Sequence, residues 1–222
     1  MSKKVKLGVV GDPIEHSLSP FIHSRFSRNE NVNLNYLAYK VNNDDFDMFI
    51  KEFFQDKEAK GLNITLPHKK RAASLEGKIS QEARYINAVN TIVNDNDKLH
   101  LFSTDGVGFI NDIENRKFNL KNKNILIIGA GAAVESILYR VAASKPMKIT
   151  VINRTIEKAD RLIRKFGNMT QIKSEVDTDK PFDLVINGSS AGLTGDFFPE
   201  ENIPITSKTY FYDLNYSLTE TP

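Results

Sequence analysis

The run from Lys123 to Val134 constrains the fold of this chain more than any other feature of its sequence. The unbroken aliphatic run Ile125–Ile128 leads directly into Gly129-Ala130-Gly131, and apolar residues at helical spacing follow. A strand, a glycine turn and a helix in this order form the first unit of a dinucleotide-binding fold. One glycine permits the tight turn, and the next lets backbone amides approach a pyrophosphate at the helix N-terminus. The turn alone is ambiguous, because such turns are common in α/β proteins and the third glycine of the full fingerprint is missing.

The next expected strand ends in Asn153-Arg154-Thr155, about 20 residues beyond the turn, where an NAD-specific site presents an acid to the ribose 2′-hydroxyl. Arg154 occupies that place instead. A guanidinium matches a 2′-phosphate in geometry and charge, and Lys158, one turn along the following helix, adds a second positive charge. The sequence therefore favours NADP over NAD. The alternative is a solvated basic face, which would also include Arg161, Arg164 and Lys165.

Strand-like and helix-like segments alternate along the whole chain. Parallel neighbours need a crossover connection that a helix normally supplies, so this alternation predicts an α/β protein with mostly parallel sheets. Runs rich in β-branched or aromatic residues predict strands, and apolar residues at helical spacing predict helices. We expect strands over 5–10, 34–41, 61–65, 90–93, 125–128, 148–152, 184–187 and 209–213, and helices over 104–114, 131–144 and 156–166.

Two more helices are expected in the first half from their start signals. Ser19-Pro20 is typical of an N-cap followed by proline at the first helical position. Asn43 is expected to cap the next helix, whose apolar residues recur at helical spacing from Phe46 to Phe53. The segment 104–114 lies between the two alternating series. We therefore expect two α/β lobes, residues 1–103 and 104–222, that meet near residue 104.

Composition excludes several functional classes. Lys plus Arg exceed Asp plus Glu by only 30 − 28 = 2, so nothing calls for a nucleic acid partner. The chain has no cysteine, which excludes disulfides, thiolate nucleophiles and cysteine zinc sites and suits a reducing cytoplasm. No apolar run is long enough to span a membrane or to form a secretory signal, so no membrane partner is expected.

The four histidines show no metal-ligand spacing, so no metal is expected. His16 and His68 are expected to lie in loops near a site. His23 and His100 are expected to be structural.

Polar clusters fall at the ends of the expected strands, where open α/β sheets bind ligands. Ser17 and Ser19 stand two apart in the first loop, so both hydroxyls could reach one polyol or carboxylate ligand. Period-2 alternation puts Asn63 and Thr65 on one side of their strand, and Lys69 follows just past a proline. Similar clusters occupy 87–91 and 103–106. Each could be ordinary turn chemistry, and Lys69 alone could belong to a solvated basic run.

Taken together, these motifs resemble the shikimate dehydrogenase family. In the first half they are S-L-S-P at 17–20, N-I-T-L-P-H-K at 63–69, A-V-N-T at 88–91 and T-D-G at 104–106. In the second half they are G-A-G at 129–131, N-R-T at 153–155, N-G-S-S-A-G at 187–192, and Y-D-L-N-Y followed by T-P at the end. Their order and spacing match the family over the whole chain.

The resemblance implies an N-terminal α/β substrate lobe followed by a Rossmann-like, doubly wound NADP-binding lobe. It implies a cytoplasmic enzyme, monomer or homodimer, that reversibly reduces 3-dehydroshikimate to shikimate with NADPH in aromatic amino acid (chorismate) biosynthesis. Two alternatives stay open: a shikimate/quinate dehydrogenase of broader specificity, and a catalytically silent ligand-binding homologue. The presence of Lys69 and Asp105 favours an enzyme.

The resemblance also assigns residues. Lys69 and Asp105 are expected to form the catalytic pair, with Lys69 acting either as a proton donor or as an electrostatic clamp on the developing oxyanion. The residues expected to hold the substrate are Ser17, Ser19, Asn63, Thr65, Lys69, Asn90, Asp105 and Tyr216. Those expected to hold NADP are Gly129, Ala130, Gly131, Ala132, Ala133, Asn153, Arg154, Thr155, Lys158, Asn187 and Ser189.

The sequence departs from the family pattern at several points. Ala132 stands where the family usually has a further glycine, and Val134-Glu135 replaces a stretch that often carries a basic residue, so weaker pyrophosphate contacts are expected. N-G-S-S at 187–190 varies the usual N-A-T-S. The family also continues past the position of Pro222 with helices that pack on the substrate lobe and bring a glutamine to the substrate. A polypeptide ending at Pro222 is expected to be a weakened or inactive enzyme, and a fragment of a longer chain is the alternative. A measured mass of 25.1 kDa would identify the former.

Overall fold

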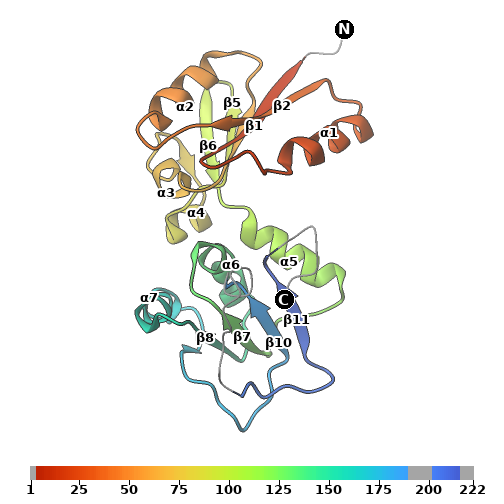
Figure 1. The fold of residues 1–222 in the computed structure, drawn as a ribbon, viewed down its shortest axis with the longest axis vertical. Coiled ribbons are helices and arrows are strands. Elements are labelled where there is room, and N and C mark those ends of the chain that lie inside the picture. The colour runs from red at the N-terminus through yellow and green to blue at the C-terminus, as the bar shows by residue number, and fades with distance from the viewer. Residues whose placement is uncertain (1–3, 190–201, 216–222) are drawn as a thin grey trace. The chain divides into compact units, whose positions relative to one another are not determined.

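The computed structural model describes residues 4–189 and 202–215. The chain divides into two compact units, Met1–Thr104 and Asp105–Pro222. Helices and strands alternate in both units (Figure 1), which confirms the expected α/β class. No helix in the described ranges is long and apolar enough to cross a membrane.

The described part of the first unit forms a six-stranded sheet in the order β2-β1-β3-β5-β6-β4. All neighbours are parallel except β5, which runs antiparallel to both β3 and β6. The strands are β1 (Val5–Gly11), β2 (Leu34–Lys40), β3 (Gly61–Ile64), β4 (Lys78–Ile79), β5 (Thr91–Asp95) and β6 (Lys98–Phe102). The helices are α1 (Ser19–Asn29), α2 (Phe46–Gln55), α3 (Lys69–Ala72) and α4 (Gln81–Ile86).

The strand order places α1 and α2 on opposite faces of this sheet. The chain moves from β1 through α1 to β2 on one side, and from β2 through α2 back past β1 to β3 on the other. Right-handed crossovers in opposite directions put their helices on opposite faces, as Figure 1 shows. The main core lies under α2, where Phe46, Ile50 and Phe53 pack with buried residues of β1, β3 and β5.

The described part of the second unit forms a five-stranded parallel sheet in the order β11-β10-β7-β8-β9. The strands are β7 (Asn124–Ile128), β8 (Lys148–Ile152), β9 (Ile172–Lys173), β10 (Leu184–Asn187) and β11 (Tyr210–Asp213). The helices are α5 (Asp105–Asn115), α6 (Ala132–Ala143) and α7 (Ile156–Phe166). Every residue of β7 and β8 is buried, as a parallel strand covered on both faces requires.

The strand order of the second unit reverses beside β7. From β7 the chain goes outward through α6 to β8 and through α7 to β9, and then returns to β10 on the other side of β7. A reversal of this kind opens a crevice outside the carboxyl ends of the two central strands, and open α/β sheets bind ligands there. In this unit the strand order reverses between β7 and β10, so the expected binding position is where these two strands end.

Two predicted helix caps are wrong by one residue or more. Ser19 is the first residue of α1 and not its N-cap, which is Leu18; the side chain of Ser17 accepts a hydrogen bond from the Ser19 amide instead. Asn43 does not cap α2, whose N-cap is Asp45. The side-chain oxygen of Asn42 accepts hydrogen bonds from the amides of Asp44 and Asp45, at 2.9 and 3.0 Å. The turn therefore begins one residue earlier than expected.

Candidate active site

The first unit gathers its predicted polar residues at one edge of its sheet. Asn63 and Thr65 lie where β3 ends, and the loop that carries Ser17 follows the end of β1, which is parallel to β3. Asn90 precedes β5. Because β5 runs antiparallel to β3, its beginning lies at the edge where β3 ends, and Thr91 is directly opposite Asn63. Residues far apart in the sequence therefore share one edge.

A chain of hydrogen bonds links these residues. The Tyr36 hydroxyl donates to Asn63 Oδ1 at 2.8 Å and is also hydrogen-bonded to the Ser19 side chain. The Asn63 amide nitrogen donates to Thr91 Oγ1 at 3.4 Å, and Thr91 Oγ1 donates to Asn90 Oδ1 at 2.9 Å. The cluster thus runs without a break from the start of α1 to the start of β5, and each side chain in it has a fixed orientation.

The side-chain oxygen of Asn90, Oδ1, accepts several hydrogen bonds at this edge. It accepts from the Thr104 amide at 3.0 Å and from Thr104 Oγ1 at 3.1 Å, in addition to Thr91. Asn90 is only 9% exposed. Because its oxygen is committed to the protein, any contact of Asn90 with a ligand has to use the amide nitrogen, which is a donor.

Tyr36 remains a neutral hydroxyl donor to Asn63 over the whole physiological pH range. Burial raises the pKa of Tyr36 to about 12, although its hydrogen bond with Ser19 acts in the other direction. The His23 ring stacks on the Tyr36 ring, with centroids 4.0 Å apart. Asn63 Oδ1 therefore stays an acceptor for Tyr36, and Asn63 can donate to another group only through its amide nitrogen, which also donates to Thr91.

Lys69 is the first residue of α3 and is half-buried. Its carbonyl oxygen accepts a hydrogen bond from the Val89 amide at 2.9 Å, which joins the start of α3 to the segment before Asn90. The neighbouring His68 lies in the turn that precedes α3, beside Lys69, and its side chain is fully buried. Its Nε2 donates to the Val41 carbonyl at 2.7 Å, and its ring stacks on Phe46.

The first loop is held from outside by a charged cluster. Glu15 accepts from the Ile14 amide at 3.0 Å and from Lys40 Nζ at 2.8 Å, and the same ammonium lies 3.8 Å from Asp12. The hydrogen bond from Lys40 lowers the pKa of Glu15 to about 2. The exposed His16 lies in this loop, as expected.

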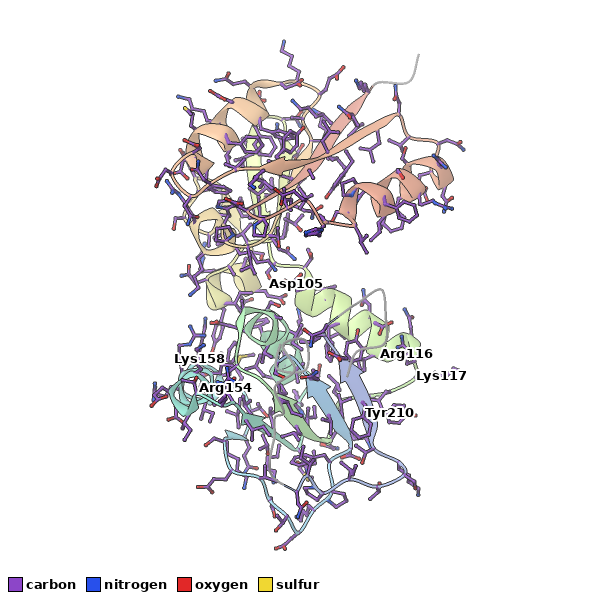
Figure 2. All side chains as sticks on the ribbon, viewed as in Figure 1. Asp105, Arg116, Lys117, Arg154, Lys158 and Tyr210 are labelled. Atoms are coloured by element: carbon purple, nitrogen blue, oxygen red, sulfur yellow. The ribbon has the colours of Figure 1, made fainter. Side chains whose placement is uncertain are left out.

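Two predicted substrate residues belong elsewhere in the chain. Asp105 is the first residue of α5 and so the first residue of the second unit (Figure 2). It follows Thr104 directly, whose amide is bound to Asn90. Tyr216 lies outside the described residues.

At the glycine turn of the second unit, the loop after β7 lies close to the loop after β10. Gly129 has φ +104°, which disfavours any residue with a side chain, and a Cβ built on it would lie 2.8 Å from the backbone of Gly188. Gly131 is the N-cap of α6, and a Cβ there would meet no protein atom within 4 Å. Of these two residues, the fold itself therefore requires glycine at Gly129 but not at Gly131.

Asparagine side chains connect the turns at this edge. Asn153 Oδ1 accepts from the Ala130 amide at 3.1 Å, and its amide nitrogen donates to the Thr155 carbonyl at 2.8 Å. After β10, Asn187 Oδ1 accepts from both the amide and the hydroxyl of Ser189 at 3.1 and 3.0 Å. The Ser189 carbonyl in turn accepts from Asn215 at 2.7 Å. These residues order the three loops at the carboxyl ends of the strands.

Arg154 and Lys158 lie where α7 begins (Figure 2), and both are exposed. Not all the cations of α7 form one solvated face. Arg161 and Lys165 bind the carboxylate of Glu135 on α6, at 3.0 and 2.8 Å. Two of the cations in the alternative interpretation, a solvated basic face, are therefore paired with a carboxylate.

The residues of this edge fit a dinucleotide with a 2′-phosphate. Gly131, Ala132 and Ala133 at the start of α6 are exposed, and the space in front of Gly131 is open. First-turn amides of a helix bind phosphate oxygens, and arginine and lysine at the end of the next strand bind an additional phosphate. Among the described residues, no group of three or more His, Asp or Glu side chains could hold a metal ion.

Sequence reasoning missed Tyr36, Thr91 and Thr104, which complete the hydrogen-bonded chain of the first unit. Thr91 and Thr104 belong to motifs already singled out, so the signal was present. Tyr36 lies in β2, and nothing local marks its hydroxyl as a partner of a residue 27 positions later. Only the pairing of β1 with both β2 and β3 reveals it.

Comparison with known proteins identifies two family models in this chain. The shikimate dehydrogenase substrate binding domain matches residues 9–92, and the shikimate / quinate 5-dehydrogenase model matches residues 112–194. A shikimate dehydrogenase (NADP(+)) of Hahella chejuensis is 38% identical over 216 residues, which is 96% of this chain and 80% of that protein. One of Legionella pneumophila is 39% identical over 216 residues, 96% and 79% of the two chains.

A solved structure gives the same result for the fold. The shikimate 5-dehydrogenase of Thermus thermophilus, crystallised with NADP(H) and shikimate, superimposes with a TM-score of 0.77 at 27% sequence identity. The superposition covers 95% of this chain and 78% of that protein.

Proposed function

Because the chain belongs to the shikimate dehydrogenase family, we propose that it is an NADP-dependent oxidoreductase that reduces 3-dehydroshikimate to shikimate reversibly. The observation that carries the proposal is the match of both family models, one on each unit, with relatives 38–39% identical over 96% of the chain. The reaction is a step of chorismate and aromatic amino acid biosynthesis.

We assign substrate binding to the polar edge of the first unit. Ser17, Ser19, Asn63, Thr65 and Asn90 present hydroxyls and amides to a small ring that carries hydroxyls and a carboxylate. The hydrogen-bonded chain supports this assignment, because Tyr36 and Thr104 fix which end of each asparagine can face a ligand. An oriented donor set of this kind binds without the entropic cost of ordering its side chains.

The catalytic pair is Lys69 and Asp105. NADPH, when bound, supplies the hydride that adds to the carbonyl carbon of the substrate. Negative charge then develops on the carbonyl oxygen, and Lys69 stabilises that charge and donates the proton that completes the hydroxyl group. In the reverse direction Lys69 takes this proton back. By the same family resemblance, the Asp105 carboxylate is the second member of this pair.

The cofactor belongs to the second unit. The start of α6 provides amides for the pyrophosphate, and Arg154 and Lys158 provide charge for the 2′-phosphate, which distinguishes NADP from NAD. Tyr216, although it lies outside the described residues, is assigned to the substrate by the same family resemblance. We further propose that the protein is cytoplasmic, acts as a monomer or homodimer, and has no nucleic acid partner.

The test is the formation of NADPH from shikimate and NADP, followed at 340 nm. The same assay with NAD and with quinate measures the strictness of the enzyme. We expect turnover with shikimate and NADP and at least about tenfold lower kcat/KM with NAD, since the 2′-phosphate contacts are charge-assisted. No turnover with either acid under any condition would favour the silent homologue.

A further inference from the structure

Glu135 is a buried carboxylate in the first turn of α6. The residue is 9% exposed, yet it is charged and lies in a helix whose remaining buried residues are mostly apolar. Its two oxygens have separate partners: Oε2 accepts from Arg161 Nη2 at 3.0 Å, and Oε1 accepts from Lys165 Nζ at 2.8 Å. Both partners belong to α7.

These two ion pairs fasten one turn of α7 to the start of α6. A carboxylate removed from water is stable only when it is paired, and each pair is a charge-assisted hydrogen bond. Arg161 and Lys165 are four residues apart, so they lie on the same face of α7, one turn from each other. One side chain on α6 thus fixes both the distance between α6 and α7 and the rotation of α7 about its own axis.

The same two helices carry the groups that we assign to the phosphates of the cofactor. α6 begins at Ala132, with its first amides exposed beside Gly131. α7 begins just after Arg154 and carries Lys158 one turn before Arg161, on the face that Glu135 holds. The rotation of α7 therefore sets how far Lys158 lies from the amides of α6.

We propose that Glu135 is the positioning residue for recognition of the 2′-phosphate. It holds α7 so that Arg154 and Lys158 meet a phosphate on the ribose while the pyrophosphate lies at α6, and it keeps Arg161 and Lys165 away from the ligand. This inference rests on the proposed function, because it presumes that the second unit binds NADP. It predicts that loss of the carboxylate weakens the contribution of the 2′-phosphate specifically.

The chain offers a matched control. Lys148 and Asp177 form another ion pair in the same unit, 3.1 Å apart, with the Lys148 side chain only 10% exposed. This pair lies at the beginning of β8, whereas the cofactor site lies where β8 ends. Asp177→Asn therefore removes a comparable ion pair without touching the link between α6 and α7.

The experiment is calorimetric titration of the full chain with 2′,5′-ADP and with 5′-AMP, which differ only in the 2′-phosphate. The dissociation constant of 5′-AMP divided by that of 2′,5′-ADP measures 2′-phosphate recognition without any catalytic assay, and a larger ratio means stronger recognition. We expect Glu135→Gln to reduce this ratio by about tenfold, with the 5′-AMP constant within about twofold of the parent. Arg154→Ala should reduce it at least as much, and Asp177→Asn should leave it unchanged.

An unchanged ratio in Glu135→Gln, with a reduced ratio in Arg154→Ala, would overturn the role of Glu135 and leave the proposed function intact. A parent protein that does not prefer 2′,5′-ADP would instead contradict the proposed use of NADP. If Glu135→Gln does not fold, Arg161→Gln replaces it. The Arg161 side chain is 46% exposed, so this change cuts one of the two links without burying a lone charge. It should reduce the ratio by a smaller factor, and an unchanged ratio would again refute the inference.

Discussion

The amide of Thr104 donates a hydrogen bond to the side-chain oxygen of Asn90 at 3.0 Å. Thr104 is the last residue of the first unit, and the next residue in the chain is Asp105. A single buried asparagine therefore holds the backbone at Thr104, directly before Asp105, whose carboxylate we propose as catalytic. In turn, Asn90 is oriented by Thr91, which is linked to Asn63 and through it to Tyr36.

The first prediction follows from this link. Asn90→Ala leaves the Thr104 amide without its acceptor, which should destabilise the protein by about 1–3 kcal/mol and reduce kcat by about 100-fold or more. Asn94→Ala is the control, because Asn94 is equally buried and donates to the Ala59 carbonyl. Urea unfolding and steady-state kinetics of both variants separate the two effects. Equal losses of kcat in both would mean that Asn90 acts only through stability.

The second prediction concerns Lys69. Lys69→Ala should lower kcat by about 10²–10⁴-fold, because the proton donor of the reduction is lost. The dissociation constant of NADPH, measured by its fluorescence, should not change. Lys70→Ala removes an equal charge from the exposed neighbouring position and should keep full activity. Normal turnover of Lys69→Ala would end the assignment of this residue to catalysis.

The third prediction compares the two glycines of the turn. Gly129→Ala forces a side chain to φ +104° and against the Gly188 backbone, so it should cost about 1–3 kcal/mol from strain alone and more from the clash. Gly131→Ala meets no protein atom and should keep unfolding free energy within about 1 kcal/mol of the parent. It should nevertheless weaken NADP binding, because the added methyl group would occupy the space at the start of α6 that we assign to the pyrophosphate. Equal stability of the two variants in urea would contradict this reading of the turn.

The fourth prediction is a pH dependence of stability. The pKa of Tyr36 is raised from 10.0 to about 12 in the folded protein, so folding favours its neutral form. This contribution is fully present below pH 10 and is lost as the pH rises from 10 towards 12, because only the unfolded chain then ionises readily. Urea unfolding across this pH range should show that the free energy of unfolding falls more steeply with pH in the parent than in Tyr36→Phe. Tyr210→Phe, which changes an exposed ring, should retain the slope of the parent.

The sequence alone determined the class of the fold and most of its elements. β7, β8 and α7 follow directly from a long aliphatic run, a β-branched run and a 3.6-residue apolar period, and their observed bounds agree with those expected to within one residue. Patterns of this kind are strong because burial of a whole strand or helix face imposes them on every residue of the element. The short elements β4, β9 and α3 were not expected, since two to four residues carry too little periodicity.

Only the tertiary structure decided how the candidate site residues are held. Asn63 and Thr91 face each other because β5 runs antiparallel, and Glu135 is neutralised by two cations 26 and 30 residues away. His68 lies in a turn, as its sequence predicts, but only the tertiary structure shows that its ring is buried and stacked on Phe46. Local sequence records the propensity of each segment and the chemistry of each side chain. Which side chains become partners depends on strand order and helix packing, and these are set by burial of the whole chain at once.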